Sequence, residues 1–293
     1  MHIGIVSPIV VLHPDAHSAW ERTGSIDDLA SVAETADRLG FHHLTCSEHV
    51  AVPLEVARTR GGTYWDPLAT FGYLAARTTR IRLATQVLVL GYHHPLEIAK
   101  RYGTLDVVSG GRLVLGLGVG TLREEFDLLN APFEDRGARA DDALGALRAA
   151  LSRSEPEYSG NYYEFRDLLV EPHAVQDRVP LWIGGRTMRS LRRAVEHGDG
   201  WVPFGLRGDE LHAMLGKVEI PEGFEVVLST GAPLDPLGDR DRAARALDRR
   251  REAGATIASV AIAATGPGHF CEQLEALHRL GTELGIEFEP TAG

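Results

Sequence analysis

Short apolar segments alternate with longer segments of helical periodicity along the whole chain. The first pair is the run from Ile3 to Ser7 and the segment from Asp27 to Leu39, whose apolar residues recur every three or four positions until Gly40. The same alternation continues to the end of the sequence. Strands are predicted at 3–7, 42–46, 81–90, 112–117, 181–183, 201–204, 224–229 and 257–263. Helices are predicted at 27–39, 66–77, 96–108, 135–151, 188–196, 209–218, 241–253 and 270–280.

Eight strand-helix pairs in 293 residues predict an α/β protein with a (β/α)8 TIM barrel. A doubly wound parallel sheet is the alternative, because alternation by itself does not say whether the sheet closes. Two long connections predict insertions after strands 2 and 4: 49–64 follows the second strand, and 152–179 follows the fourth strand-helix pair. No linker or repeat divides the sequence, so we expect one domain over 1–293.

Composition and charge narrow the class of function. The chain is 44% hydrophobic and 24% charged, as in ordinary globular proteins. Its net charge of −11 is spread along the sequence, which argues against nucleic-acid or membrane partners and favours a small-molecule substrate. Cys46 and Cys271 lie far apart and suit a reducing compartment. The first apolar run ends at His13-Pro14, too soon for a signal peptide or membrane span, so a cytoplasmic protein is expected.

A strand, a glycine turn and a helix between Val179 and Phe204 predict a phosphate site. Gly184 and Gly185 follow the strand and let the backbone approach a ligand closely. The helix that follows begins near Arg186 and Thr187, whose free N–H groups and helix dipole attract an anion. The alternative is an ordinary tight turn in which Thr187 merely caps the helix.

Glu48 and His49 stand at the carboxyl end of the second strand, where barrel enzymes place catalytic residues. A histidine there can stabilise a developing anion or handle a proton near neutral pH. Strand alternation predicts that only one of the two side chains faces a ligand. An ordinary polar loop is the alternative. The paired histidines elsewhere have no metal-ligand spacing, so no metal is expected.

A glycine run, Gly116-Leu-Gly-Val-Gly-Thr121, follows the fourth strand. It is a weak dinucleotide signal, because it lacks the third glycine of GxGxxG and does not follow the first strand. At a barrel mouth, Gly118 and Gly120 would instead admit a flat ring close to the backbone. Close packing of the strand end explains these glycines equally well.

Several stretches together resemble the luciferase-like oxidoreductases, and most of all the actinobacterial branch that depends on the deazaflavin coenzyme F420. The resemblance runs from about Met1 to Phe204, with the motifs in the order of the family. The stretches are IRLATQVLVL, HPLEIAKRYGTLDVVSGGRLVLGLGVG, REEFDLLNAPFEDRGARADDAL and PLWIGGRTMRSLRRAVEHGDGWVP.

The resemblance implies a cofactor lying in the mouth of a TIM barrel. Its phosphate would lie at the turn 184–187, and its ring would lie over strands two to four. His49, preceded by Glu48, matches the acidic-histidine pair that contacts the deazaflavin. The segment that backs the ring is matched by Thr85, Gln86 and Val87, and the resemblance implies a cis peptide at Gln86–Val87. The strand-four turn is matched by Gly118 and Gly120.

The chain departs from the family at two positions. Some members carry a proton-donating glutamate where Thr121 stands, which makes His49 the better candidate for proton transfer. His94 stands where many relatives have a smaller polar residue, so substrate access differs. The resemblance also implies a homodimer.

The resemblance implies hydride transfer between reduced deazaflavin and a small organic substrate, in either direction. An FMN-dependent monooxygenase fed by a partner reductase is the second hypothesis. A non-catalytic cofactor-binding protein, which the Thr121 departure permits, is the third.

Overall fold

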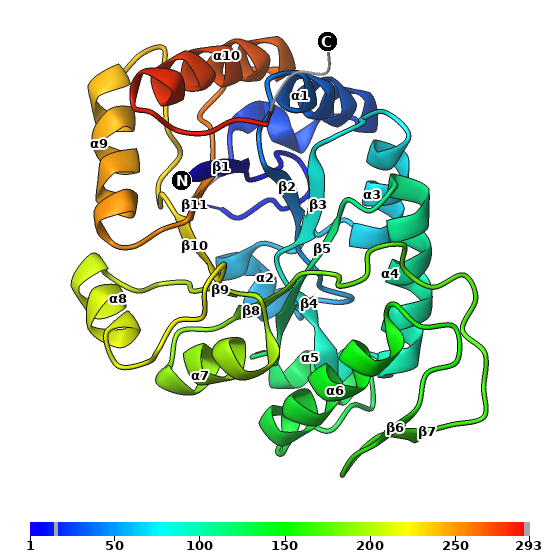
Figure 1. Ribbon diagram of the computed structural model, residues 1–293. Helices are drawn as coiled ribbons and strands as arrows, with labels where there is room; N and C mark the ends of the chain where they lie inside the picture. Colours follow the sequence, from blue (N-terminus) through cyan, green and yellow to red (C-terminus); the bar gives the residue numbers. More distant parts are fainter. Residues whose placement is uncertain (15–16, 290–293) are drawn as a thin grey trace.

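The computed structural model describes residues 1–14 and 17–289. Its centre is a closed barrel of eight parallel strands with helices outside it (Figure 1). The strands are β1 (His2–Ile5), β2 (His43–Cys46), β3 (Arg82–Thr85) with its continuation β4 (Leu88–Val89), β5 (Leu113–Gly118), β8 (Leu181–Gly184), β9 (Gly200–Val202), β10 (Glu225–Ser229) and β11 (Ile257–Val260). They follow the order β3-β2-β1-β11-β10-β9-β8-β5, and a β3–β5 pairing closes the sheet. The barrel prediction is confirmed, and the doubly wound alternative is wrong.

The helices between the strands lie close to their predicted positions. Local hydrogen bonds fix several of their starts: Ser25, Asp66 and Thr187 each accept a backbone N–H of the first turn. The helices that follow the barrel strands are α1 (Ile26–Arg38), α3 (Pro67–Ala75), α4 (Pro95–Ser109), α6 (Arg136–Ala150), α7 (Met188–His197), α8 (Gly208–Leu215), α9 (Arg240–Glu252) and α10 (Pro267–Glu283).

The core has two parts. The larger one packs the apolar faces of the helices against the outside of the sheet. A smaller cluster comes from neighbouring strands and fills the barrel interior, with Trp182 at 0% exposure as its largest member. Trp182 is therefore a core residue, and its indole N–H donates to Glu225 at 2.5 Å.

The long connections contain structure that periodicity misses. Helix α2 (Leu54–Arg60) lies in the connection after β2 and has no buried residue, so no apolar stripe marks it in the sequence. Helix α5 (Arg123–Leu128) follows β5. Between α6 and β8, strands β6 (Tyr158–Ser159) and β7 (Glu164–Phe165) form a hairpin that projects from the barrel (Figure 1). Short 3-10 helices occur at η1 (Ala19–Arg22) and η2 (Leu90–Tyr92).

Several predicted strands are shorter than expected, among them the first, which ends at Ile5, and the eighth, which ends at Val260. Two others lie at the mouth of the barrel. The third breaks after Thr85 and resumes as β4, and the Gln86–Val87 peptide between the two segments is cis, as the resemblance implies. The sixth ends at Val202, so Phe204 lies in the loop beyond it. Within the described ranges, no helix has both the length and the apolar character needed to cross a membrane.

Candidate active site at the barrel mouth

A cavity of about 330 Å³ lies at the carboxyl ends of the barrel strands. Its walls come from the segments that follow β1, β2, β3, β5, β8 and β9, so the closure of the barrel brings them together. The lining residues are Val11, Ser47, Glu48, His49, Tyr64, Gln86, Val87, Val89, Tyr92, Gly118, Val119, Gly120, Thr121, Gly184, Gly185 and Phe204. Functional sites of TIM barrels occupy this face.

Most residues predicted for the site line this cavity, and three do not. Thr85 is fully buried behind it and donates its hydroxyl hydrogen bond to the carbonyl of Gly116 at 2.8 Å. Arg186 and Thr187 lie beyond the lining, at the start of α7. The structure thus gathers Glu48, His49 and the glycine turns around one space, while Thr85 supports its wall from behind.

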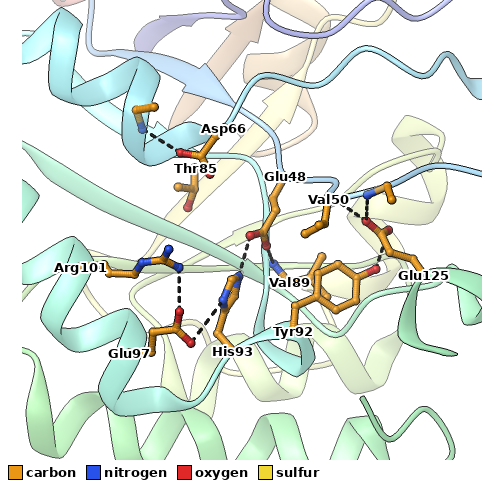
Figure 2. Close-up of polar contacts among 12 residues, drawn as sticks. Glu48, Val50, Asp66, Thr85, Val89, Tyr92, His93, Glu97, Arg101 and Glu125 are labelled. Carbon is orange, nitrogen blue, oxygen red and sulfur yellow. Dashed lines mark hydrogen bonds and ion pairs between the residues drawn. The ribbon is translucent and has the colours of Figure 1, made fainter. Parts of the chain in front are cut away.

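His49 is held by a carboxylate that comes from α5. Its Nδ1 lies 2.6 Å from Oε2 of Glu125, and Glu125 is 0% exposed. The same carboxylate accepts the backbone N–H groups of Val50 at 2.6 Å and Ala51 at 3.2 Å, and the hydroxyl of Tyr92 at 2.7 Å. Figure 2 shows Tyr92 and Val50 converging on Glu125.

These hydrogen bonds decide the charge of Glu125 and the tautomer of His49. Burial would raise the pKa of Glu125, but the hydrogen bonds from His49, Tyr92 and the backbone outweigh it and lower that pKa below its ordinary value. An ionised Glu125 accepts only, so we assign the proton between the two residues to Nδ1 of His49. In neutral His49 the other nitrogen, Nε2, is then free to accept a proton.

Glu48 lines the same cavity but is engaged on the side of β4. One of its oxygens accepts the N–H of Val89 at 2.8 Å, and the other lies 2.6 Å from Nε2 of His93 (Figure 2). The side chain of Glu48 is 7% exposed, against 26% for His49. Both residues contact the space, and His49 is the more open of the two.

The turn after β8 has the features of both sequence interpretations. Gly185 has φ +141°, and a Cβ there would lie 2.6 Å from Cβ of Ser190. Thr187 does cap α7, because its hydroxyl oxygen accepts the N–H of Ser190 at 3.3 Å. Arg186 is exposed and has no hydrogen-bond or ion-pair partner within the described residues. The cap leaves the backbone of Gly185 at the cavity wall, so capping and ligand binding are compatible.

The glycines of β5 serve close packing as well as the cavity. A Cβ on Gly116 would lie 1.9 Å from the carbonyl oxygen of Thr85, and one on Gly118 would lie 2.7 Å from a methyl group of Val87. Gly116 is therefore explained by packing, whereas Gly118 also lines the cavity. Gly120 adopts φ +75° against the ring of Phe126.

Sequence reasoning missed Glu125, Tyr92, Tyr64 and Phe204. Glu125 belongs to the stretch REEF that contributes to the family resemblance, but an acidic residue in a short helix has the pattern of a surface position. Only its complete burial sets it apart. No group of three or more His, Cys, Asp or Glu side chains in the described ranges is placed to hold a metal ion.

The fold and the site define a TIM-barrel protein with a cavity at the carboxyl ends of its strands. The model of the luciferase-like monooxygenase family matches residues 1–280. The chain therefore belongs to the luciferase-like monooxygenase family, whose members are oxidoreductases.

Known relatives use two kinds of cofactor. An F420-dependent glucose-6-phosphate dehydrogenase of Amycolatopsis mediterranei is 27% identical over 270 residues, which cover 89% of this chain and 78% of the relative. The oxygenase component of a flavin-dependent trigonelline monooxygenase of Acinetobacter baylyi is 25% identical over 195 residues, covering 65% and 52%. The crystal structure of the monooxygenase RslO1 from Streptomyces bottropensis superposes with a TM-score of 0.78 at 22% identity, covering 98% of this chain and all of that one, and supports the fold.

Proposed function

We propose that the protein is a coenzyme F420-dependent oxidoreductase that transfers a hydride between the deazaflavin and a small organic substrate. The observation that carries the proposal is the barrel-mouth cavity, in which the His49–Glu125 pair lies on one wall and the glycine turn after β8 on another. The F420-dependent relative, similar over 89% of this chain, supports this choice of cofactor.

The lining suits a flat heterocycle with a phosphate tail. The side-chain oxygen of Gln86 is buried without a hydrogen-bond partner, and a ring N–H is a suitable donor to it. Gly118 and Gly184 present backbone in place of side chains on the cavity wall. Gly185 and the N–H groups at the start of α7 would hold the phosphate, with Arg186 beside them. The tail of F420 carries further acidic groups, which exposed Arg186 would meet.

The residues of this chain divide the work of the reaction. When bound, the deazaflavin supplies the ring carbon that gives or takes the hydride. His49 lies on the wall with Nε2 free to hold the proton that accompanies the hydride, while Glu125 fixes its orientation. A second hollow of about 180 Å³ shares Val11 and Ser47 with the cavity and gives room for a substrate. The walls position both molecules and exclude water.

An FMN-dependent monooxygenase fed by a partner reductase is the second candidate, supported by the flavin-dependent relative. The same cavity and turn would hold FMN, and the difference is chemical, because reduced flavin reacts readily with oxygen. A non-catalytic cofactor-binding protein is the third, since Thr121 lines the cavity where some relatives have a glutamate.

The homodimer, the single domain and the cytoplasmic location stay predictions.

Anaerobic titrations with F420 and with FMN, read by fluorescence, test the proposal. We expect tight binding of F420 and weak binding of FMN. Preference for FMN with oxygen consumption during turnover would establish the monooxygenase instead. Binding without turnover of any substrate in a broad panel would favour the non-catalytic protein, and binding of neither ring would contradict all three.

Replacing Gly185 with alanine is expected to weaken cofactor binding about tenfold, which corresponds to about 1.4 kcal/mol. The added Cβ would collide with Ser190 at 2.6 Å, and the positive φ disfavours any side chain, so the backbone that receives the phosphate must move. The same fluorescence titration measures the effect. Gly208→Ala is the matched control, because a Cβ there meets nothing within 4 Å. If Gly185→Ala binds the cofactor with unchanged affinity, the turn at Gly185 does not hold the phosphate.

A further inference from the structure

A row of ionisable side chains leads from the cavity wall to the protein surface. Glu48, on the wall, lies 2.6 Å from Nε2 of His93, and Nδ1 of His93 lies 3.9 Å from Oε2 of Glu97. Glu97 is 46% exposed and forms an ion pair with Arg101 at 2.8 Å. Figure 2 shows these side chains in sequence, with His93 between the two carboxylates.

We propose that Glu48, His93 and Glu97 form a proton route between the active-site cavity and solvent. The inference rests on the proposed function, because it concerns the proton that accompanies the transferred hydride. Glu48 is the group that meets the cavity, and His93 and Glu97 act through it.

The geometry suits relay without rotation of the histidine ring. Each nitrogen of His93 faces a different carboxylate, so a proton taken up at Nε2 is matched by one released from Nδ1. The second oxygen of Glu48 is fixed by the N–H of Val89, which keeps the first directed at His93. The 3.9 Å step to Glu97 closes by movement of that exposed side chain or through one water molecule.

The reaction moves a proton as well as a hydride, and the route lets that proton exchange with solvent when ligands fill the cavity. In substrate reduction the reduced ring loses a hydride and a proton, and a carbonyl substrate gains the hydride at carbon and a proton at oxygen. The reverse reaction releases a proton from the alcohol oxygen. His49 has no second outlet, because the oxygens of its partner Glu125 are occupied by three further donors in a fully buried position. Glu48 and His93 connect the cavity to solvent on another side.

The charges around His93 favour a role near neutral pH. Burial and Arg101 oppose its protonation, but the hydrogen bond and charge of Glu48 and the charge of Glu97 outweigh them and raise the pKa of His93 above its ordinary value. Tyr92 and Tyr102, which also feel the charge of Glu48, have raised pKa values because they are buried, so they stay neutral.

The first test uses the cofactor-free protein and nitrogen NMR titration of its histidines. We expect the pKa of His93 to lie above the ordinary value of a histidine, and Glu97→Gln to lower it. Glu275→Gln is the matched control, because Glu275 is 44% exposed and paired with Arg38 at 3.1 Å elsewhere on the surface. A His93 pKa that is ordinary, or that Glu97→Gln leaves unchanged, would overturn the route whatever the cofactor.

The second test measures reduction of menadione by reduced F420. Here the quinone gains a hydride and a proton while the ring is oxidised. His93→Gln keeps an N–H donor for Glu48 but cannot relay a proton, so we expect turnover to fall at least tenfold with cofactor affinity unchanged. His93→Ala is expected to regain activity with added imidazole. If the turnover of His93→Gln stays within twofold of wild type, His93 has only a structural role and the proposed proton route is wrong. A wild-type protein that does not bind F420 would contradict the proposed function instead, and the NMR titration would still decide the route.

Discussion

Replacing His49 with alanine is expected to lower turnover by about a hundredfold to a thousandfold, the usual contribution of a positioned acid-base group. The change removes the nitrogen that holds the proton at the cavity wall. It also leaves buried Glu125 with one hydrogen bond fewer, so a modest loss of stability is expected. Steady-state rates with saturating cofactor, together with a melting temperature, measure the two effects separately.

Two further variants make this result specific. His212→Ala is the control, because His212 is exposed on α8 and lies outside the cavity lining. Glu125→Gln keeps the shape of the side chain but removes its charge, so we expect a smaller loss of about tenfold from poorer orientation of His49. If His49→Ala keeps both the turnover and the cofactor affinity of wild type, the role assigned to His49 is wrong.

Acidification from pH 6.5 to 5 is expected to destabilise the fold by about 2 kcal/mol for each of two buried histidines. His42 and His43 are 5% and 0% exposed, and their Nδ1 atoms are 3.0 Å apart. Burial, followed by the nearby charge of Arg82, lowers the pKa of His43 to about 3. Burial, followed by the charge of His43, lowers the pKa of His42 as well.

The direction of this pH effect follows from the protonation of the two histidines in the folded and unfolded states. In the unfolded chain both histidines take up protons below pH 6.5, whereas in the folded protein they stay neutral until the pH approaches their lowered pKa values. Stability is therefore complete above pH 6.5 and is lost as the pH falls. His278, whose pKa burial also lowers, contributes in the same direction. His93, whose pKa is raised, loses its contribution only as the pH rises above 6.5.

Urea unfolding at several pH values between 5 and 6.5 checks this prediction. Wild type is expected to lose about 1.4 kcal/mol per pH unit for each buried histidine. In His43→Leu, the loss of unfolding free energy per pH unit should be smaller than in wild type by the contribution of one histidine. This difference does not depend on the absolute stability of the variant. A wild-type stability that stays constant across this window would show that the two histidines are protonated in the folded state.

The part of the fold that is local could be predicted from the sequence. Apolar spacing identified the strands and helices of the barrel, because period and burial are linked within each element. Helix α2 was not predicted, because it buries no residue and so has no apolar stripe in the sequence. The interruption of the third strand at Gln86 leaves no mark on periodicity, and only the resemblance to the family implied it.

The candidate site divides in the same way. The sequence placed Glu48, His49 and the Gly184–Gly185 turn at strand ends, since parallel strands in a barrel deliver their carboxyl ends to one face. It did not reveal which residues form hydrogen bonds with Glu48 and His49. Glu125 is 76 positions from His49, and His93 is 45 positions from Glu48.

By itself, then, the sequence determined the strand-helix alternation, the glycine turns and, through its motifs, the family. The tertiary structure decided which carboxylate holds His49, which histidine meets Glu48, and that Thr187 caps α7 while Gly185 still lines the cavity. The physical reason is that periodicity records whether a residue is buried within its own element. Hydrogen bonds between strand ends and distant helices depend on closure of the barrel, which no local pattern contains.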